Sequence, residues 1–231
     1  MTIKAIGFDI DGTLYPHYRM FLYSLPSFLA HPLFVMHFSR VRSEMRKYMA
    51  GGDFRAVQAR LLAEKLKADP SETAELIEQY LYRAWEKPFR LVRPYPHVSE
   101  ALAAFKNAGL RLGVLSDFPV GNKLSVLGVE RYFDVILSSE DTGYLKPHKE
   151  PFLRLSRELS VEPEEMLYVG NSYAKDIEGA QACGMLTAYI CRRGSKGDAT
   201  IKFSQYRELE DAVLRLVGVY SAYECQNHCK K

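Results

Sequence analysis

From about residue 94 onward, short apolar segments alternate with helical segments, and this alternation constrains the fold more than any other feature of the sequence. The apolar runs have the length of buried strands and lie at residues 110–117, 133–139, 166–171, 185–192 and 201–203. The helical segments lie at residues 98–107, 150–159, 174–183 and 206–217. Strands connected through helices predict a doubly wound α/β fold, in which helices cover both faces of a parallel sheet.

A further strand is predicted at residues 3–8, and the sequence FDIDGTLYP overlaps its end. Asp9 and Asp11 would project to the same side if the extended geometry continued through Ile10. Two carboxylates that close destabilise each other unless a cation lies between them or one of them keeps a proton. An ordinary Asp-Gly turn, with Asp9 as the cap of a following helix, would explain the same residues without any chemistry.

Polar residues also follow the ends of the later strands. Ser116 and Asp117 end one apolar run, Asn171 ends another with Asp176 five positions on, and Lys146 lies in the intervening loop GYLKPHKEPF. Ligands of parallel sheets bind outside the carboxyl ends of the strands. We therefore expect these side chains and the aspartates of the first strand to form one site at this edge.

Each of these residues also has an explanation that involves no function. Ser116 and Asp117 are residue types that favour helix caps. Lys146 could be a solvated loop lysine, with Lys149 as the alternative member of any site. The expectation of a site therefore depends on all the strand ends taken together.

Residues 16–93 separate the first strand from the alternating region and are predicted to be helical. Apolar residues recur at three- and four-residue spacing, from Val41 to Met49 and from Val57 to Leu66, with Gly51-Gly52 between the two helices. Asp69-Pro70-Ser71-Glu72 predicts the start of a third helix with Asp69 as its N-cap. The sequence thus predicts an α/β core domain, residues 1–15 and 94–231, and a smaller all-α domain, residues 16–93.

The apolar stretch at residues 21–38 approaches the length of a membrane span. Pro26, Pro32, His31 and His37 interrupt it, so we expect short helices and no membrane insertion. The N-terminus lacks a signal-peptide pattern, because two aspartates occur within its first 11 residues, and we expect a cytoplasmic protein.

Charge and cysteine content exclude other classes. The chain has 31 basic and 28 acidic residues, a net charge of +3, which gives no sign of a nucleic-acid partner. None of the 4 cysteines forms a Cys-x-x-Cys pair. Cys225, His228 and Cys229 offer three neighbouring ligands where a closed zinc site needs four, so we expect a solvated tail.

In this order and spacing, the four polar motifs resemble those of the haloacid dehalogenase superfamily of phosphohydrolases. FDIDGTLYP is similar to the first motif of that family, VLSD to the second, LKPHKEPF to the third and VGNSYAKDIEGA to the fourth. The resemblance covers residues 1–15 and 94–231, and residues 16–93 match the helical cap of the family only in position and helical character. It implies a Rossmann-like core with an all-α cap domain.

The resemblance also implies a role for each residue of the motifs. Asp9 would be the nucleophile that forms an aspartyl-phosphate, and Asp11 the general acid and base. The implied magnesium ligands are Asp9, Asp11 through its backbone carbonyl, Asn171 and Asp176. The implied phosphate-binding residues are Gly12, Thr13, Ser116, Asp117 and Lys146. Asn171 departs from the family, which usually has aspartate there, and this removes one negative charge from the metal site.

The function predicted in this way is a Mg²⁺-dependent phosphatase that acts on a small phosphorylated molecule. The alternatives are a phosphomutase of the same fold and a catalytically silent phosphate-binding protein. A phospho-accepting receiver domain is disfavoured, since the paired acids open the sequence and a helical insert follows them. Dehalogenase activity is disfavoured, because the dehalogenases that resemble this chain lack the second aspartate and Asp11 is present. The oligomeric state is not predicted.

Cations are frequent at residues 39–60, and we expect them to form a solvated helix face. They are Arg40, Arg42, Arg46, Lys47, Arg55 and Arg60, against the acidic Glu44 and Asp53. The alternative is that one or two of these arginines, or the segment His17-Tyr18-Arg19, contact the leaving group. The aromatic residues Tyr18, Phe21 and Phe34 are expected to belong to the core of the helical segment.

Overall fold

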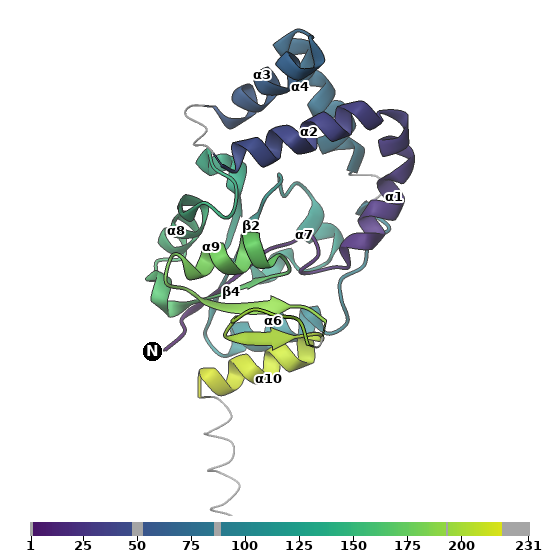
Figure 1. Ribbon diagram of the computed structural model, residues 1–231. Helices are drawn as coiled ribbons and strands as arrows, with labels where there is room; N and C mark the ends of the chain where they lie inside the picture. Colours follow the sequence, from purple (N-terminus) through teal and green to yellow (C-terminus); the bar gives the residue numbers. More distant parts are fainter. Residues whose placement is uncertain (1, 48–52, 86–88, 193, 219–231) are drawn as a thin grey trace, which may run out of the picture.

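The computed structural model describes residues 2–47, 53–85, 89–192 and 194–218 (Figure 1). Its centre is a six-stranded sheet in the order β3-β2-β1-β4-β5-β6, and every neighbouring pair of strands runs parallel. The strands are β1 (Ala5–Phe8), β2 (Arg111–Ser116), β3 (Val135–Ser138), β4 (Met166–Gly170), β5 (Leu186–Ile190) and β6 (Ile201–Phe203). The predicted doubly wound parallel sheet is therefore confirmed.

Helices cover both faces of this sheet. α6 (Val98–Asn107) and α10 (Tyr206–Leu216) lie on one face, where Phe105 and Leu209 join a core with Phe8. α8 (Lys149–Glu158) and α9 (Glu178–Gln181) lie on the other face, where Phe152 packs with Tyr168. Because both faces are covered, β1 and β4 are buried at every position, as their continuous apolar sequences predict.

Two glycines in the centre of the sheet allow α8 to lie close to it. A Cβ atom built on Gly7 of β1 would lie 2.7 Å from a methyl carbon of Leu155, and one on Gly113 of β2 would lie 2.8 Å from the other methyl carbon of the same leucine. Real Cβ atoms do not approach other atoms this closely. The two glycines therefore determine how near the helix packs to the sheet.

Shorter elements connect the strands. They are α7 (Lys123–Val126), η3 (Glu130–Tyr132), η4 (Ser139–Thr142), η5 (Pro163–Glu165) and η6 (Tyr173–Ile177). The helix predicted at residues 174–183 is in fact the π-helical turn η6 followed by the short α9. The backbone N–H groups of Asn171 and Ser172 donate to the Asp176 carboxylate, so this turn folds around the aspartate.

The segment between β1 and α6 is helical, as predicted, and lies beyond one edge of the sheet in Figure 1. It contains α1 (His17–Ala30), α2 (Pro32–Met45), α3 (Phe54–Leu66), α4 (Pro70–Ile77), η1 (Glu78–Tyr82) and η2 (Arg83–Trp85). Val41, Leu62 and Leu81 belong to its own apolar cluster. Asp69 caps α4 by accepting from the N–H groups of Ser71 and Glu72, which confirms the predicted N-cap.

The apolar stretch at residues 21–38 folds into most of α1 and the first half of α2, which are longer helices than expected and meet at His31. Pro32 stands in the first turn of α2, where a proline costs no hydrogen bond, so it starts a helix at that point. Within the described residues, no helix is both long and apolar enough to cross a membrane.

Several expectations for this segment are wrong. Arg42 is only 3% exposed and Arg46 is largely buried, whereas Arg40, Lys47, Arg55 and Arg60 are exposed as predicted. Tyr18 is 60% exposed and therefore not a core residue, while Phe34 packs partly buried against the apolar cluster of the helices. The Phe21 side chain, Gly51-Gly52 and the Cys225, His228 and Cys229 tail lie outside the described residues.

Candidate active site

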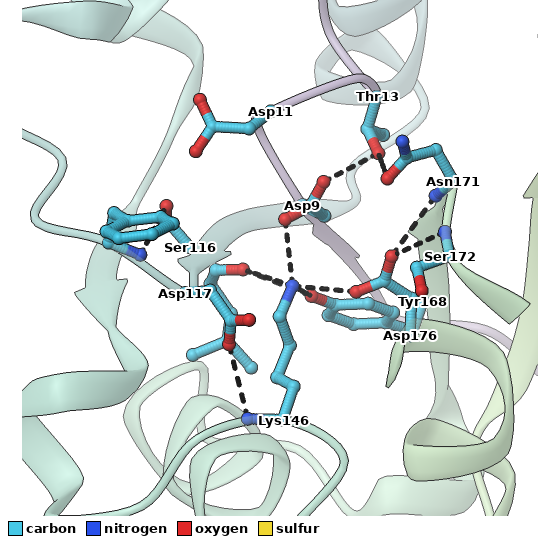
Figure 2. A network of polar contacts seen from close by, with 12 residues as sticks. Asp9, Asp11, Thr13, Ser116, Asp117, Lys146, Tyr168, Asn171, Ser172 and Asp176 are labelled. Carbon is cyan, nitrogen blue, oxygen red and sulfur yellow. Dashed lines mark hydrogen bonds and ion pairs between the residues drawn. The ribbon is translucent and has the colours of Figure 1, made fainter. Parts of the chain in front are cut away.

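Three neighbouring strands deliver the predicted site residues to one edge of the sheet. Asp9 follows β1 directly, Ser116 is the last residue of β2, and Asn171 follows β4 directly. Because β1 pairs in parallel with both β2 and β4, the ends of these three strands lie side by side. The position of β1 between β2 and β4 thus places Asp9 at the centre of the site (Figure 2).

Lys146 connects the strand ends. Its Nζ atom lies 2.8 Å from Oδ1 of Asp9 and 2.7 Å from Oδ1 of Asp176, at the middle of the network in Figure 2. The same atom lies 3.2 Å from the backbone oxygen of Leu115 and 3.2 Å from the hydroxyl of Tyr168. Burial alone would lower the pKa of Lys146, but the negative charges of Asp176 and Asp9 raise it well above its usual value. The ammonium group therefore stays charged between the two carboxylates.

Asp9 is held from both sides. Its Oδ1 atom accepts from Lys146, and its Oδ2 atom accepts from the Thr13 hydroxyl at 2.8 Å. The side chain is almost fully buried, and burial raises the pKa of Asp9 to about 7 against the opposing charge of Lys146. An aspartate with so little hydration is a carboxylate prepared to bind an external cation or electrophile.

Asp11 lies in a separate environment. Lys123 Nζ is 2.8 Å from both of its carboxylate oxygens, and the Tyr15 hydroxyl donates to Oδ1 at 2.6 Å. Burial would raise the pKa of Asp11, but Lys123 and the hydrogen bond from Tyr15 lower it below its usual value. The two aspartates do not project the same way, and Figure 2 shows the Asp11 carboxylate pointing away from Asp9. The strand ends at Phe8, so the extended geometry does not continue through Ile10.

Gly12 is required by the way the first motif folds back toward the fourth. Its φ is +98°, a conformation that residues with a side chain rarely adopt. A Cβ atom at this position would lie 2.1 Å from Nδ2 of Asn171. The glycine therefore allows Asn171 to lie directly against the loop that carries both aspartates.

The second motif is divided between two roles. The Ser116 hydroxyl is fully buried and accepts from the N–H of Phe118 at 3.2 Å. Asp117 instead lies 2.6 Å from the Arg46 guanidinium and accepts from the Lys146 N–H. Burial would raise the pKa of Asp117, but Lys146, Arg46 and Arg42 hold it at about 2. Its carboxylate thus joins the loops of the second and third motifs and helix α2.

The fourth motif contributes a set of oxygen atoms. Asp176 is buried, and its Oδ2 atom accepts from the N–H groups of Asn171 and Ser172 while Oδ1 faces Lys146. The Asn171 amide oxygen lies 3.4 Å from the Thr13 hydroxyl. A Cβ atom on Gly170 would lie 2.3 Å from the side chain of Asp176, so only glycine fits before the motif.

These oxygen atoms are the ligand type that Mg²⁺ prefers. Asp9 and Asp176 supply two carboxylates, and Asn171 supplies an amide oxygen beside them. Among the described residues, no three His, Cys, Asp or Glu side chains come together as a ready-made metal site. The donor set therefore fits a divalent cation held by two carboxylates and neutral oxygens, with less negative charge than three carboxylates would give.

Sequence reasoning missed four residues of this site. Lys123 and Tyr15 hold Asp11, Tyr168 contacts the Lys146 ammonium, and Arg46 binds Asp117. Tyr15 had a usable signal, because it stands four residues after Asp11 and local pairs are readable from spacing. Lys123 had none, because nothing in its neighbourhood separates it from an ordinary loop lysine.

Comparison with known proteins identifies the arrangement. The family model described as haloacid dehalogenase-like hydrolase matches residues 6–190, a range that includes every candidate site residue from Asp9 to Asp176. The chain belongs to the haloacid dehalogenase-like hydrolase family. This membership confirms the superfamily that the four motifs predict.

Curated relatives of this haloacid dehalogenase-like hydrolase are phosphatases. The glyceraldehyde 3-phosphate phosphatase of Methanopyrus kandleri is 32% identical over 207 residues, covering 85% of this chain and 87% of the relative. The phosphoglycolate phosphatase of Aquifex aeolicus is 30% identical over 189 residues, covering 80% of this chain and 84% of the relative. The prediction of a phosphatase is thereby confirmed at the level of enzyme class.

Solved structures support the fold of this haloacid dehalogenase-like hydrolase. The 2-haloacid dehalogenase of Pseudomonas syringae pv. Tomato superposes with a TM-score of 0.69 at 24% identity, covering 93% of this chain and 99% of that one. The phosphatase of Thermococcus onnurineus superposes with a TM-score of 0.62 at 22% identity, covering 91% and 98%. At these identities the likeness concerns the fold alone, so it does not argue for dehalogenase activity.

Proposed function

We propose that this haloacid dehalogenase-like hydrolase releases phosphate from a small phosphomonoester through an aspartyl-phosphate on Asp9, with Mg²⁺ as its cofactor. The observation that carries the proposal is the position of Lys146, whose ammonium joins Asp9 and Asp176 in a buried cluster at the strand ends. The curated relatives named for glyceraldehyde 3-phosphate and phosphoglycolate support a small substrate. Residues 1–15 and 94–231 would form the catalytic core, and residues 16–93 would form a cap over it.

In the first half-reaction, a carboxylate oxygen of Asp9 forms a bond to phosphorus as the bond from phosphorus to the alcohol oxygen breaks. The electron pair of the broken bond stays on the alcohol oxygen, which needs a proton. Asp11 supplies this proton and thereby becomes a carboxylate. Lys146 orients Asp9 for this attack through its 2.8 Å contact.

In the second half-reaction, water attacks the phosphorus of the aspartyl-phosphate. Asp11 accepts a proton from this water as the bond from phosphorus to the Asp9 oxygen breaks. Phosphate leaves, Asp9 is again a carboxylate, and Asp11 gives its proton to solvent. Lys123 and Tyr15, which both donate to Asp11, would stabilise its carboxylate form between the two steps.

Donors around Asp9 would stabilise the charge on the transferring phosphoryl group. The proposed donors are the Lys146 ammonium, the Ser116 and Thr13 hydroxyls, and the backbone around Gly12. The Asp117 side chain is a poor phosphate ligand because it is an anion already bound to Arg46. We propose that Asp117 instead fixes the position of the Lys146 loop relative to the loop that carries Ser116.

The magnesium site would consist of the Asp9 and Asp176 carboxylates, the Asn171 amide oxygen and the backbone carbonyl of Asp11. When bound, Mg²⁺ supplies positive charge that screens the anionic nucleophile from the anionic phosphate. Lys146 performs part of the same neutralisation within the chain, because it contacts both carboxylates.

Phosphomutase activity and silent phosphate binding remain the alternatives to this proposal. A phosphomutase would return the phosphoryl group to a second alcohol instead of water, and no contact in the site favours that outcome. A silent protein is disfavoured because Asp9, Asp176 and Lys146 are buried together. Burying charged groups costs free energy of desolvation, and such clusters are typical of catalytic sites.

The test is the Asp9→Asn variant, assayed for release of phosphate from 4-nitrophenyl phosphate in the presence of Mg²⁺. We expect activity to fall to background, because a neutral amide cannot act as the nucleophile. Asp69→Asn is the matched control, since it makes the same chemical change at an exposed helix cap. Retention of wild-type rates by Asp9→Asn would refute the mechanism, and an inactive wild-type protein would support the silent alternative.

A further inference from the structure

A cavity of about 380 Å³ lies between helix α2 and the carboxyl edge of the sheet. One face of α2 and its C-cap forms the first wall, with the residues Val35, Phe38, Ser39, Arg42, Ser43 and Arg46. The opposite wall consists of Leu81, Phe118 and Lys175. The cavity therefore separates the helical segment from the loops of the active site.

Among the described residues, those with a charge that line this cavity are all cations: Arg42, Arg46 and Lys175. The two arginines bind acids that do not line it, Glu140 at 2.6 Å and Asp117 at 2.6 Å. Lys175 is exposed and makes no hydrogen bond or ion pair with any other residue in the described part of the chain. The cavity thus has an excess of positive charge and no acidic wall.

A buried donor in the lining also lacks a partner. Arg42 is 97% buried, and its terminal nitrogen atoms bind Gln58, Glu140 and the backbone oxygen of Asp117. Its Nε–H has no hydrogen-bond partner among the described residues. An unpaired buried N–H is costly, so this atom is a donor that a ligand oxygen would satisfy.

The cavity adjoins the reacting groups through three of its lining residues. Arg46 donates to the backbone oxygen of Lys146 at 2.5 Å, and Phe118 donates to the Ser116 hydroxyl at 3.2 Å. Lys175 immediately precedes Asp176 in the fourth motif. A substrate whose phosphate lies at Asp9 could therefore extend into the cavity from the active site.

Apart from Ser39 and Ser43, the remaining lining residues are apolar. Val35, Phe38, Leu81 and the Phe118 ring offer a surface for carbon atoms, and the Arg42 guanidinium stacks on that ring at 4.0 Å. Cations combined with apolar walls are suited to a short carbon chain or ring that ends in an anion. A neutral sugar would offer no anion to Lys175, which makes no ion pair within the described part of the chain.

We propose that this cavity binds a second anionic group, a carboxylate or a further phosphate, on the alcohol part of the substrate. The proposal rests on the phosphatase activity proposed above and specifies its substrate class. Lys175 is the main specificity-determining residue, with the Arg42 Nε–H as a second donor. Arg46 strengthens the positive field while it remains bound to Asp117.

The test compares matched substrates on the full-length protein. One series consists of alkyl phosphates of two to six carbons, and the second consists of the same chains with a terminal carboxylate. A third series carries a terminal phosphate. We expect kcat/KM of the wild-type protein to be about 10- to 100-fold higher with an anionic terminus at the best chain length, as a charge-assisted hydrogen bond would give. The second and third series show which anion is preferred.

The variants are Lys175→Gln and the control Lys149→Gln, which removes an exposed lysine at the start of α8. Lys175→Gln should remove most of the preference for anionic termini, mainly through KM, and leave the alkyl phosphates unchanged. Lys149→Gln should keep the preference of the wild-type protein.

Four results would overturn the inference, and they do not all have the same meaning. If the wild-type protein hydrolyses all three series equally well, or if Lys175→Gln keeps the preference, the cavity does not bind a second anion. If Lys175→Gln loses activity on alkyl phosphates as well, Lys175 acts on the reacting phosphate instead. Absence of hydrolysis of every ester would refute the proposed function itself, and the inference with it.

Discussion

Asp9 and Asp11 are two positions apart in the sequence, but their surroundings shift their pKa values in opposite directions. Burial raises the pKa of Asp9 to about 7, whereas Lys123 and Tyr15 lower the pKa of Asp11. Without substrate, Asp11 is therefore ionised at neutral pH and is suited to accept a proton. It can donate a proton only if the pKa rises, and the negative charge of a bound phosphate has that effect. The substrate itself would then convert Asp11 into the acid that the first half-reaction needs.

The Asp11→Asn variant tests this role at the level of one residue. An alkyl alcohol leaves poorly without a proton, whereas 4-nitrophenolate leaves unaided, so the loss should be far larger for an alkyl phosphate. General acid catalysis is worth about 10² to 10⁴-fold, and we expect a contrast of that order in kcat/KM. Equal losses on both substrates would show that Asp11 is not the proton donor.

Asn171 is the second residue whose role can be tested alone. Affinity for hard divalent cations increases with the number of charged ligands, so Asn171→Asp should lower the Mg²⁺ concentration that gives half-maximal activity. Asp176→Ala should raise that concentration or abolish activity. The measurement is activity against free Mg²⁺ at one saturating substrate concentration. Asn107→Asp, the same change at an exposed position of α6, is the control and should leave the curve unmoved.

If Asn171→Asp also leaves the magnesium curve unmoved, Asn171 is not a ligand. Its position against Gly12 and 3.4 Å from the Thr13 hydroxyl would then give it an ordering role in the first motif loop. The carboxylate added by Asn171→Asp would also repel the substrate phosphate. KM should therefore rise slightly even if metal binding becomes tighter.

At the level of elements, helix α2 is tied to the core by two arginines. Arg42 binds Glu140 of η4 at 2.6 Å, with both side chains at most 4% exposed, and Gln58 and the Tyr82 hydroxyl complete the network. Burial raises the pKa of Glu140 despite the opposing charge of Arg42, so the acid is sensitive to the loss of its partner. One helical turn later, Arg46 binds Asp117 and the backbone of Lys146.

Arg42→Met should therefore destabilise the protein by about 3–5 kcal/mol, because it leaves a buried carboxylate without its cation. Replacing both partners by apolar residues, in Arg42→Met with Glu140→Leu, should cost less than the single change. Arg40→Met is the control on an exposed face of the same helix, with an expected effect within about 0.5 kcal/mol. The measurement is the free energy of unfolding from urea titration. Equal effects of Arg42→Met and Arg40→Met would show that the Arg42–Glu140 ion pair does not stabilise the fold.

For the whole molecule, two aspartates of the active site make the stability depend on pH in opposite directions. The pKa of Asp9 is raised from 3.8 to about 7, so the native state binds this proton more tightly than the unfolded chain does. Its contribution to stability is complete below about pH 4 and is lost as the pH rises through about 7. Asp117, with its pKa lowered from 3.8 to about 2, has the opposite effect and stabilises the native state above about pH 4.

These signs predict opposite behaviour for two similar variants. In metal-free buffer at pH 8.5, Asp9→Asn should be more stable than the wild-type protein by on the order of 1 kcal/mol or more, and the gain should shrink by pH 5. Asp117→Asn should be less stable than the wild-type protein at both pH values, because Arg46 loses its carboxylate. The measurement is the free energy of unfolding in urea at each pH. A gain for Asp9→Asn that does not change with pH would contradict the raised pKa.

The sequence by itself determined the sheet, the helices that cover it and the edge where the site lies. Continuous apolar runs, their alternation with helices, and caps such as Asp69 all depend on interactions within a few residues of the chain. Asp9, Ser116, Asn171 and Lys146 could be assigned to one edge because parallel strands end on the same side. The contact between Tyr15 and Asp11 is also local, because the two residues are four positions apart.

The tertiary structure alone decided which charges meet. Lys123 reaches Asp11 across 112 residues of sequence, and Arg42 reaches Glu140 across 98, and neither pairing has a local pattern. A cation on an amphipathic helix has the same sequence signature whether it faces water or a buried acid. Only packing of α2 on the strand ends buries Arg42 and Arg46 while Arg40 stays exposed, because burial depends on which face of the helix meets the rest of the fold.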